Sequence, residues 1–176
     1  MLKEIDVKEL NLNPFTAFGR DWMALAAGNE ARGYNAMTVA WGHLGAIWDR
    51  KGGAGTLPTA VCFVRPQRYT KEFMDREKTF TLCAFPPEYK KALAYLGARS
   101  GRDEDKIAAV GLTPVFDADT TYFAEASLVL VCRKLYQAPL QAGGFTEPEL
   151  LEENYPRRDL HEMYIGEIVK ALVNRE

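Results

Sequence analysis

Short apolar runs, separated by glycine, proline and charged residues, dominate the hydrophobic pattern of this chain and are typical of β-strands. They predict strands over 22–27, 34–41, 59–64, 79–84, 124–135 and 162–173. Gly28-Asn29, after the first run, indicates a hairpin. The last run also fits a helical stripe, although Gly166 disfavours a helix by about 1 kcal/mol relative to alanine.

Helical spacing is confined to a few places, and predicts short helices over 69–77, 87–96, 102–110 and 146–153. The last begins with Thr146 and Glu149, which have the spacing of a capping box. Many strands with few peripheral helices indicate a closed or nearly closed antiparallel sheet. The 176 residues suit one domain over residues 1–176.

Composition narrows the function classes. Hydrophobic residues make up 47% and charged residues 26%, with a net charge of -2, so an electrostatic grip on nucleic acid is not expected. No apolar run is long enough to cross a bilayer and the N-terminus lacks a signal-peptide core, so we expect no membrane association and a cytoplasmic protein. Cys62, Cys83 and Cys132 lie in apolar runs and predict buried free thiols.

The usual catalytic motifs are absent: there is no nucleophile elbow, His-Glu-x-x-His pair, Walker loop or dinucleotide-binding glycine fingerprint. The only histidines are His43 and His161, no carboxylate cluster stands out, and no metal site is expected. This favours a protein whose chemistry comes from a cofactor. A phosphate-bearing ring cofactor needs cations for the phosphate and an apolar wall for the ring.

The segment 34–42 supplies a candidate wall. In a strand, Asn35, Met37 and Trp41 share one face. Asn35 and Thr38 need polar partners if they are buried, and the rim of a ring cofactor would provide them. The alternative is a strand end near a turn, where Asn35 bonds locally.

The segment 64–71 supplies a candidate anion site. Arg65, Arg68 and Lys71 concentrate positive charge where a helix is expected to begin, at about Thr70. The alternative is a solvated basic turn that Thr70 caps.

The segment 98–106 offers a second candidate anion site. Ser100 and Asp103 have capping-box-like spacing, and Gly101 would let a ligand approach the backbone. Further donors are Arg99, Arg102 and Lys106. The alternative is a plain junction between two helices.

Taken in order, these segments resemble the flavin reductase-like family of FMN-binding split β-barrels, particularly its flavoredoxin-like branch. The matching stretches are 35–42, 64–70, 100–103 with Lys106, and 161–168, within a resemblance that runs from about Pro14 to Val173. The resemblance implies a mainly β fold: an antiparallel, Greek-key-like split β-barrel with a few peripheral α-helices. It also implies a homodimer with FMN bound non-covalently near the interface, and a strand for the ambiguous last run.

The resemblance assigns residues to the cofactor. Beside the ring it places Asn35, Ala36, Met37, Thr38 and Trp41, and at the ribityl phosphate Arg65, Arg68, Tyr69, Thr70, Ser100, Gly101, Arg102 and Lys106. His161 would lie near the ring, where a nicotinamide or another donor approaches; the alternative is a partly buried strand histidine. His43 is expected to be structural or exposed at the rim. Gly52–Gly55 falls near the family's ring-contacting loop, and Trp48 is expected in core or dimer packing.

The expected function is therefore that of an oxidoreductase. NADH or NADPH would reduce bound FMN, and electrons would pass to free flavin, a ferric chelate or a redox protein partner. One alternative is a flavoredoxin-like electron carrier with no NAD(P)H site. Another is a non-enzymatic, ligand-binding split-barrel module.

Overall fold

A computed structural model of the chain describes residues 2–50 and 55–174. Its strands are β1 (Leu2–Ile5), β2 (Met23–Asn29), β3 (Gly33–Val39), β4 (Gly42–Asp49), β5 (Thr56–Val64), β6 (Thr79–Ala84), β7 (Pro114–Asp117), β8 (Thr120–Phe123), β9 (Leu128–Pro139) and β10 (Glu162–Asn174). Its helices are η1 (Val7–Glu9), α1 (Pro14–Thr16), η2 (Ala17–Asp21), α2 (Thr70–Arg76), η3 (Pro87–Tyr89), α3 (Lys90–Ala98), α4 (Lys106–Ala109), η4 (Ala142–Gly144) and α5 (Pro148–Asn154). None of these helices is long and apolar enough to span a bilayer.

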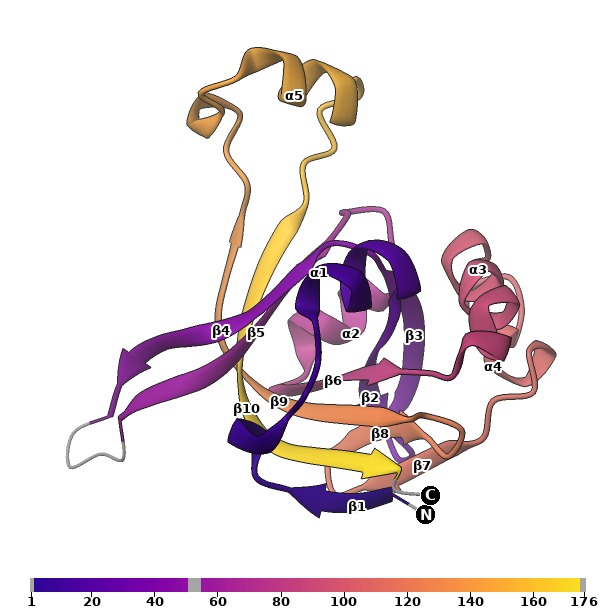
Figure 1. Cartoon of the computed structure of the whole chain (residues 1–176). Coiled ribbons are helices and arrows are strands. Elements are labelled where there is room, and N and C mark those ends of the chain that lie inside the picture. Colours follow the sequence, from indigo (N-terminus) through magenta and orange to yellow (C-terminus); the bar gives the residue numbers. More distant parts are fainter. Residues whose placement is uncertain (1, 51–54, 175–176) are drawn as a thin grey trace.

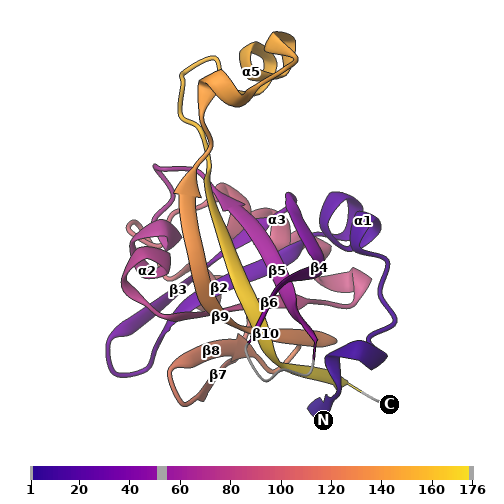
Figure 2. The same cartoon turned by 90° about the vertical axis from the view of Figure 1, so that its left-hand side faces the viewer.

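The strands form a strongly curled antiparallel sheet with small helices around it (Figures 1 and 2). The hydrogen-bonded order is β3-β2-β6-β9-β10-β5-β4, with β1 added to β10, and β7 pairs with β8 separately. A mainly antiparallel β fold is as predicted. The sheet is not closed, because over residues 2–50 and 55–174 no ladder joins β3 to β4.

Alternation along β2 explains the two-sided core. Leu25 packs in the cluster inside the curled sheet, whereas Ala24 and Ala26 pack in a second cluster that includes Leu93 and Leu96 of α3. Successive side chains of a strand point to opposite faces, so the small residues of β2 let α3 pack close. The α3 helix and the curled sheet thereby hold β3 from both sides.

The cysteine prediction is confirmed: Cys62, Cys83 and Cys132 are free and buried. Burial raises the pKa of each thiol, so these groups stay protonated and unreactive at neutral pH.

Two predicted boundaries were wrong. The strand predicted over 124–135 begins only at Leu128 and continues to Pro139, because residues 124–127 form the turn after β8, in which Ala126 N donates to Phe123 O at 3.1 Å. The helix predicted over 102–110 is only α4, which Asp105 caps by accepting from Ala108 N at 3.0 Å. The last run is a strand, β10, as the resemblance implied.

The capping-box prediction at Thr146 was also wrong. The α5 helix begins at Pro148 and has Glu147 at its N-cap, without a side-chain cap bond. Proline is common at the first helical position, because its fixed φ suits the helix and its missing N–H removes one of the unpaired donors at the helix start.

The tryptophans depart from simple core packing. Trp48, on the edge strand β4, is 45% exposed, so the prediction of core packing was wrong, while dimer packing stays a prediction. Trp41 follows the end of β3 and is 43% exposed. Of the glycine-rich loop, positions 52–54 lie outside the described residues.

An arm of residues 140–161 projects from the sheet between β9 and β10 and carries α5 (Figure 1). Leu140 N donates to His161 O at 2.9 Å and closes the base of the arm. Arg65, at the end of β5, donates to Asp159 Oδ2 at 2.7 Å and to Asn154 O at 2.9 Å. The arm is therefore tied to the sheet at this arginine.

Candidate functional site

Adjoining cavities form a furrow along the end of β3. A cationic cavity of about 110 Å³ is lined by Met37, Gln67, Arg68, Tyr69, Thr70, Ala98, Arg99, Ser100 and Lys106. A middle cavity of about 190 Å³ is lined by Met37, Thr38, Val39, Ala40, Trp41, Phe63, Arg65, Arg68 and His161. These two share Met37 and Arg68, so they are neighbours.

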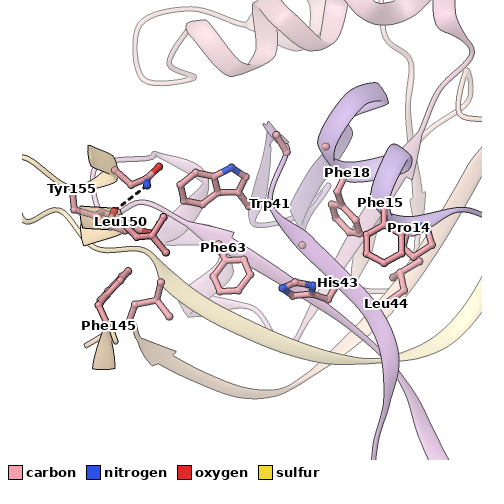
Figure 3. A pocket seen from close by; sticks show the side chains of 15 residues that line it. Pro14, Phe15, Phe18, Trp41, His43, Leu44, Phe63, Phe145, Leu150 and Tyr155 are labelled. Carbon is pink, nitrogen blue, oxygen red and sulfur yellow. Dashed lines mark hydrogen bonds between the residues drawn. The ribbon is translucent and has the colours of Figure 1, made fainter. Parts of the chain in front are cut away.

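The furrow continues into an apolar pocket of about 560 Å³ (Figure 3). Its lining is Pro14, Phe15, Phe18, Gly19, Ala40, Trp41, Gly42, His43, Leu44, Phe63, Leu140, Phe145, Leu150, Asn154 and Tyr155. It shares Ala40, Trp41 and Phe63 with the middle cavity. The chemistry of the furrow thus changes from cationic to apolar along its length.

The end of α3 holds the cations of the first cavity. Lys106 is 3% exposed, and its Nζ donates to Leu96 O at 2.8 Å and Arg99 O at 3.0 Å. Arg68 Nη1 donates to Gly97 O at 2.7 Å. These bonds satisfy carbonyls that a helix leaves free at its C-terminus, and each cation keeps donors for a ligand.

Lys106 is electrostatically poised. Burial and, as the smaller cause, the neighbouring charge of Arg68 together lower the pKa of its ammonium to about 8. A phosphate dianion bound in the cavity would compensate both effects, because an opposite charge favours the protonated lysine.

Asn35 and Gly101 pack against each other beside this cavity. Asn35 Nδ2 donates to Thr70 Oγ1 at 2.8 Å, and a Cβ on Gly101 would lie 2.3 Å from Asn35 Oδ1. The glycine therefore makes room for Asn35 rather than for a ligand. Asn35 lies within β3 and not at a strand end, and its partner, Thr70, is 35 residues away, so the local bond considered as the alternative is not the one found. Both residues line a separate hollow of about 390 Å³.

The 100–103 segment is a turn and not the helix cap that its spacing suggested. Ser100 Oγ accepts from Arg102 N at 3.2 Å, and Ser100 O accepts from Asp103 N at 3.1 Å. The Arg102 guanidinium lies over the Tyr69 ring, 4.7 Å from its centroid, and pairs with Glu72. Arg102 consequently lines neither the cationic nor the middle cavity.

An aromatic cluster bounds the middle cavity. The His161 ring lies 4.7 Å from that of Trp41, and its Nδ1 shares a hydrogen bond of 2.8 Å with the Tyr155 hydroxyl. Burial, followed by the charge of Arg65, lowers the pKa of His161 to about 4. His161 is therefore neutral at pH 7 and offers a hydrogen bond rather than a charge.

One acceptor near the middle cavity is unsatisfied. Asp159 Oδ2 accepts from Arg65 and from Gln67 Nε2, the latter at 3.0 Å, while Asp159 Oδ1 is buried and has no hydrogen-bond partner in the described part of the chain. Hydrogen bonds from Arg65 and Gln67 hold the pKa of Asp159 below its usual value. A buried carboxylate oxygen without a donor favours a ligand that brings one.

The structure brings most of the predicted residues to the two smaller cavities. They are Met37, Thr38, Trp41, Arg65, Arg68, Tyr69, Thr70, Ser100, Lys106 and His161. It does not bring Ala36 there, which packs in the core cluster beneath α3. The furrow residues that the sequence did not single out are Phe15, Phe18, Phe63, Phe145, Leu150 and Tyr155. Their only signal was apolarity, which equally fits a core.

No cluster of three or more metal-ligating side chains occurs in residues 2–50 and 55–174. The furrow instead offers cations and hydroxyls at one end and aromatic walls at the other, which suits an organic ligand.

The family model described as "Flavin reductase like domain" matches residues 55–176. The chain belongs to this flavin reductase-like family. The match includes β5, the basic turn, α3, the arm and β10, whereas β3 lies before it. No match was found among curated proteins.

Solved structures extend the similarity over the rest of the flavin reductase-like fold. The FMN-binding domain of a flavin reductases-like enzyme from Shewanella baltica has a TM-score of 0.65 at 16% identity, covering 98% of this chain and 77% of that one. Flavoredoxin of Desulfovibrio vulgaris has a TM-score of 0.64 at 21% identity, and the match covers 98% of this chain and 78% of that one. Nitrilotriacetate monooxygenase component B from Bacillus cereus has a TM-score of 0.64 at 16% identity, and the match covers 99% of this chain and 82% of that one. The split-barrel fold is thus shown.

Proposed function

We propose that this flavin reductase-like protein binds FMN non-covalently in the furrow and acts as an oxidoreductase. The observation that carries the proposal is the continuity of the cationic cavity with the aromatic-walled middle cavity, which share Met37 and Arg68. A ring joined by a short chain to a phosphate needs both environments side by side.

The phosphate would lie in the cationic cavity. Arg68 and Lys106 supply charge-assisted donors, and Thr70 and Ser100 supply hydroxyls. The isoalloxazine ring would lie in the middle cavity against Met37, Thr38 and Trp41, beside neutral His161. A flavin also carries N–H and O–H donors of the kind that the unsatisfied Asp159 Oδ1 lacks.

When bound, FMN supplies the hydride and electron chemistry. The chain's own residues would orient the ring, exclude water from one face and offer His161 as a hydrogen-bonding group at its edge. NADH or NADPH is proposed as the donor, and free flavin, a ferric chelate or a redox protein as the acceptor.

An electron carrier without a nicotinamide site is the second candidate. It is favoured by the absence of any charged side chain in the lining of the apolar pocket, because a dinucleotide diphosphate needs cations. The similarity to flavoredoxin supports the same candidate.

Flavin titration tests the first step. FMN is expected to bind with quenched flavin fluorescence, and riboflavin, which lacks the phosphate, to bind at least tenfold more weakly. A protein that quenches neither flavin would overturn the proposal and leave the non-enzymatic module.

Anaerobic mixing separates the two candidates. Bleaching of the bound flavin by NADH or NADPH supports a reductase. If neither nucleotide bleaches it while dithionite does, the reductase is ruled out and the carrier stands.

We further propose a cytoplasmic homodimer with FMN near its interface. The dimer is supported by the exposed rings of Trp48 and Tyr136, whose centroids lie 6.4 Å apart, because exposed aromatic clusters mark interfaces. The cytoplasmic location is supported by the free buried thiols, which suit a reducing compartment. Sedimentation equilibrium of the protein and of Trp48→Glu checks the dimer, since the variant should shift toward monomer.

A further inference from the structure

The apolar pocket at the end of the furrow is larger than the two cavities proposed for FMN. Its volume, about 560 Å³, is within the range of small-molecule sites, and it shares Trp41 and Phe63 with the proposed ring cavity. A molecule in this pocket would therefore lie against the flavin ring.

Four separate segments build the pocket walls, and one of them is the stretch 40–44, which includes His43. Phe15 and Phe18 come from α1 and η2, Phe63 comes from β5, and Phe145 and Leu150 come from the arm (Figure 3). Aromatic walls of this kind suit a flat ring, which can stack or pack edge-to-face against them.

Charge is missing from this lining: none of its residues is Asp, Glu, Lys or Arg. An ion that entered would lose hydration without gaining a counter-ion, which is costly. The polar groups present are mostly engaged, because Asn154 Nδ2 donates to Leu150 O at 2.9 Å and the Tyr155 hydroxyl bonds His161.

His43 is the exception. Its ring lies edge-on to Phe63, 5.9 Å between centroids, in the lower part of the pocket in Figure 3. Its imidazole makes no hydrogen bond within the described part of the chain, and an imidazole always carries at least one N–H donor. His43 is exposed on the edge strand β4, so it offers this donor at the rim of the pocket beside the apolar walls, and the pocket suits a ligand with one acceptor oxygen.

We propose that this pocket is the second-substrate site, and that it takes an uncharged aromatic carbonyl compound whose oxygen accepts a hydrogen bond from His43. This substrate class goes beyond the acceptors named above (free flavin, a ferric chelate or a redox protein), and the inference rests on the proposed FMN site. The aromatic rings and the arm would select the shape of the substrate, and the uncharged lining would reject carboxylates and phosphates.

The test uses full-length, FMN-saturated protein and three probes of one shape: 2-acetylnaphthalene, 2-naphthoate and naphthalene. By calorimetry, the ketone is expected to bind at least tenfold more tightly than the carboxylate. His43→Leu is expected to weaken the ketone about tenfold, the size of one lost hydrogen bond, and to leave naphthalene unchanged.

The second part of the test places a charge in the pocket wall. Leu150→Glu is expected to weaken the ketone at least tenfold; the side chain is 47% exposed, so the fold should tolerate the change. Val169→Glu is the matched control, because Val169 is 49% exposed on β10 and does not line the pocket. It should bind the ketone like the parent protein.

Equal binding of carboxylate and ketone, or an unchanged ketone affinity in Leu150→Glu, would overturn the inference. A second copy of the chain seated in the pocket would also overturn it. In that case the protein would bind none of the three probes, and Leu150→Glu would change its oligomeric state. FMN titration of the same variants separates the two proposals. If the parent protein binds FMN but not the ketone, only this inference is wrong. If the parent protein does not bind FMN, the proposed function is wrong.

Discussion

The two ends of the furrow use opposite physical principles. At the cationic end, Arg68 and Lys106 are fixed by hydrogen bonds to carbonyls of α3, so a few directional groups set the affinity. At the apolar end, the walls come from segments far apart in sequence, and contact area sets the affinity. A point substitution at the cationic end should therefore weaken the binding of phosphate-bearing ligands strongly. At the apolar end, a substitution that removes contact area should weaken binding by a smaller amount.

Removing the arginines gives the largest expected effect. Arg65→Ala with Arg68→Ala should cost roughly 3–6 kcal/mol of FMN binding, about 10²–10⁴-fold in Kd, because Arg68 would form a bidentate pair with the phosphate, in which each of two charge-assisted hydrogen bonds contributes about 1.5–3 kcal/mol. Riboflavin affinity should change far less. Fluorescence titration of both flavins measures this.

Two variants control that experiment. Arg133→Ala removes a surface arginine whose partner, Glu167, also pairs with Arg50, so FMN binding should not change. The single variant Arg68→Ala should carry most of the loss, since Arg65 is occupied by the arm. Equal losses for FMN and riboflavin would refute the phosphate assignment.

His161, where the two ends meet, should impose a pH dependence on folding. Its folded-state pKa of about 4 is below the ordinary 6.5, so its contribution to stability is fully present above pH 6.5 and is lost as the pH falls toward 4. The loss should reach about 3 kcal/mol at pH 4. Urea unfolding between pH 4 and 7 measures it.

His161→Phe should flatten that part of the profile. The carboxylates that also lose stability in acid, such as Asp159, are common to both proteins and cancel in the difference. Parallel profiles for parent and variant would contradict the role given to the buried imidazole.

Gly101→Ala tests the packing at the cationic end. The new methyl would meet Asn35 Oδ1 at 2.3 Å, so the variant should lose about 1–3 kcal/mol of stability, as overpacking does. Thermal unfolding measures this. Adding Asn35→Ala should relieve the clash; if the two losses simply add, the steric account is wrong.

The smallest expected effect is the titration of Lys106. Because its pKa is about 8 without a ligand and rises when phosphate binds, FMN affinity should fall up to about tenfold between pH 7 and pH 9. Riboflavin affinity should stay level over that range. Lys106→Met should bind FMN weakly at both pH values, and a persistent pH step in this variant would assign the titration to another group.

Part of this protein can be predicted from its sequence because the relevant interactions are local. The apolar runs at 22–27 and 79–84 predicted strands, which the structure has as β2 and β6, and the basic turn before Thr70 does precede a helix. The apolar contexts of Cys62, Cys83 and Cys132 correctly indicated burial. Local spacing failed where a partner distant in sequence decided the outcome, as at Asn35, which bonds Thr70, and at Trp48, which lies beside Tyr136.

The sequence by itself determined a mainly antiparallel β fold, through its many short apolar runs with few helical stretches between them, and the cationic turns, through short-range charge and glycine placement. Only the tertiary structure decided that Phe15, Phe63 and Phe145 share one pocket, since apolar residues carry no sign of which neighbour they will meet. It likewise decided that Arg65 grips the arm and that Lys106 is buried. The shared pocket and the grip of Arg65 depend on the curled sheet, which brings together segments more than 80 residues apart, as Arg65 and Asp159 are. The ammonium of Lys106 is instead held by carbonyls at the end of α3.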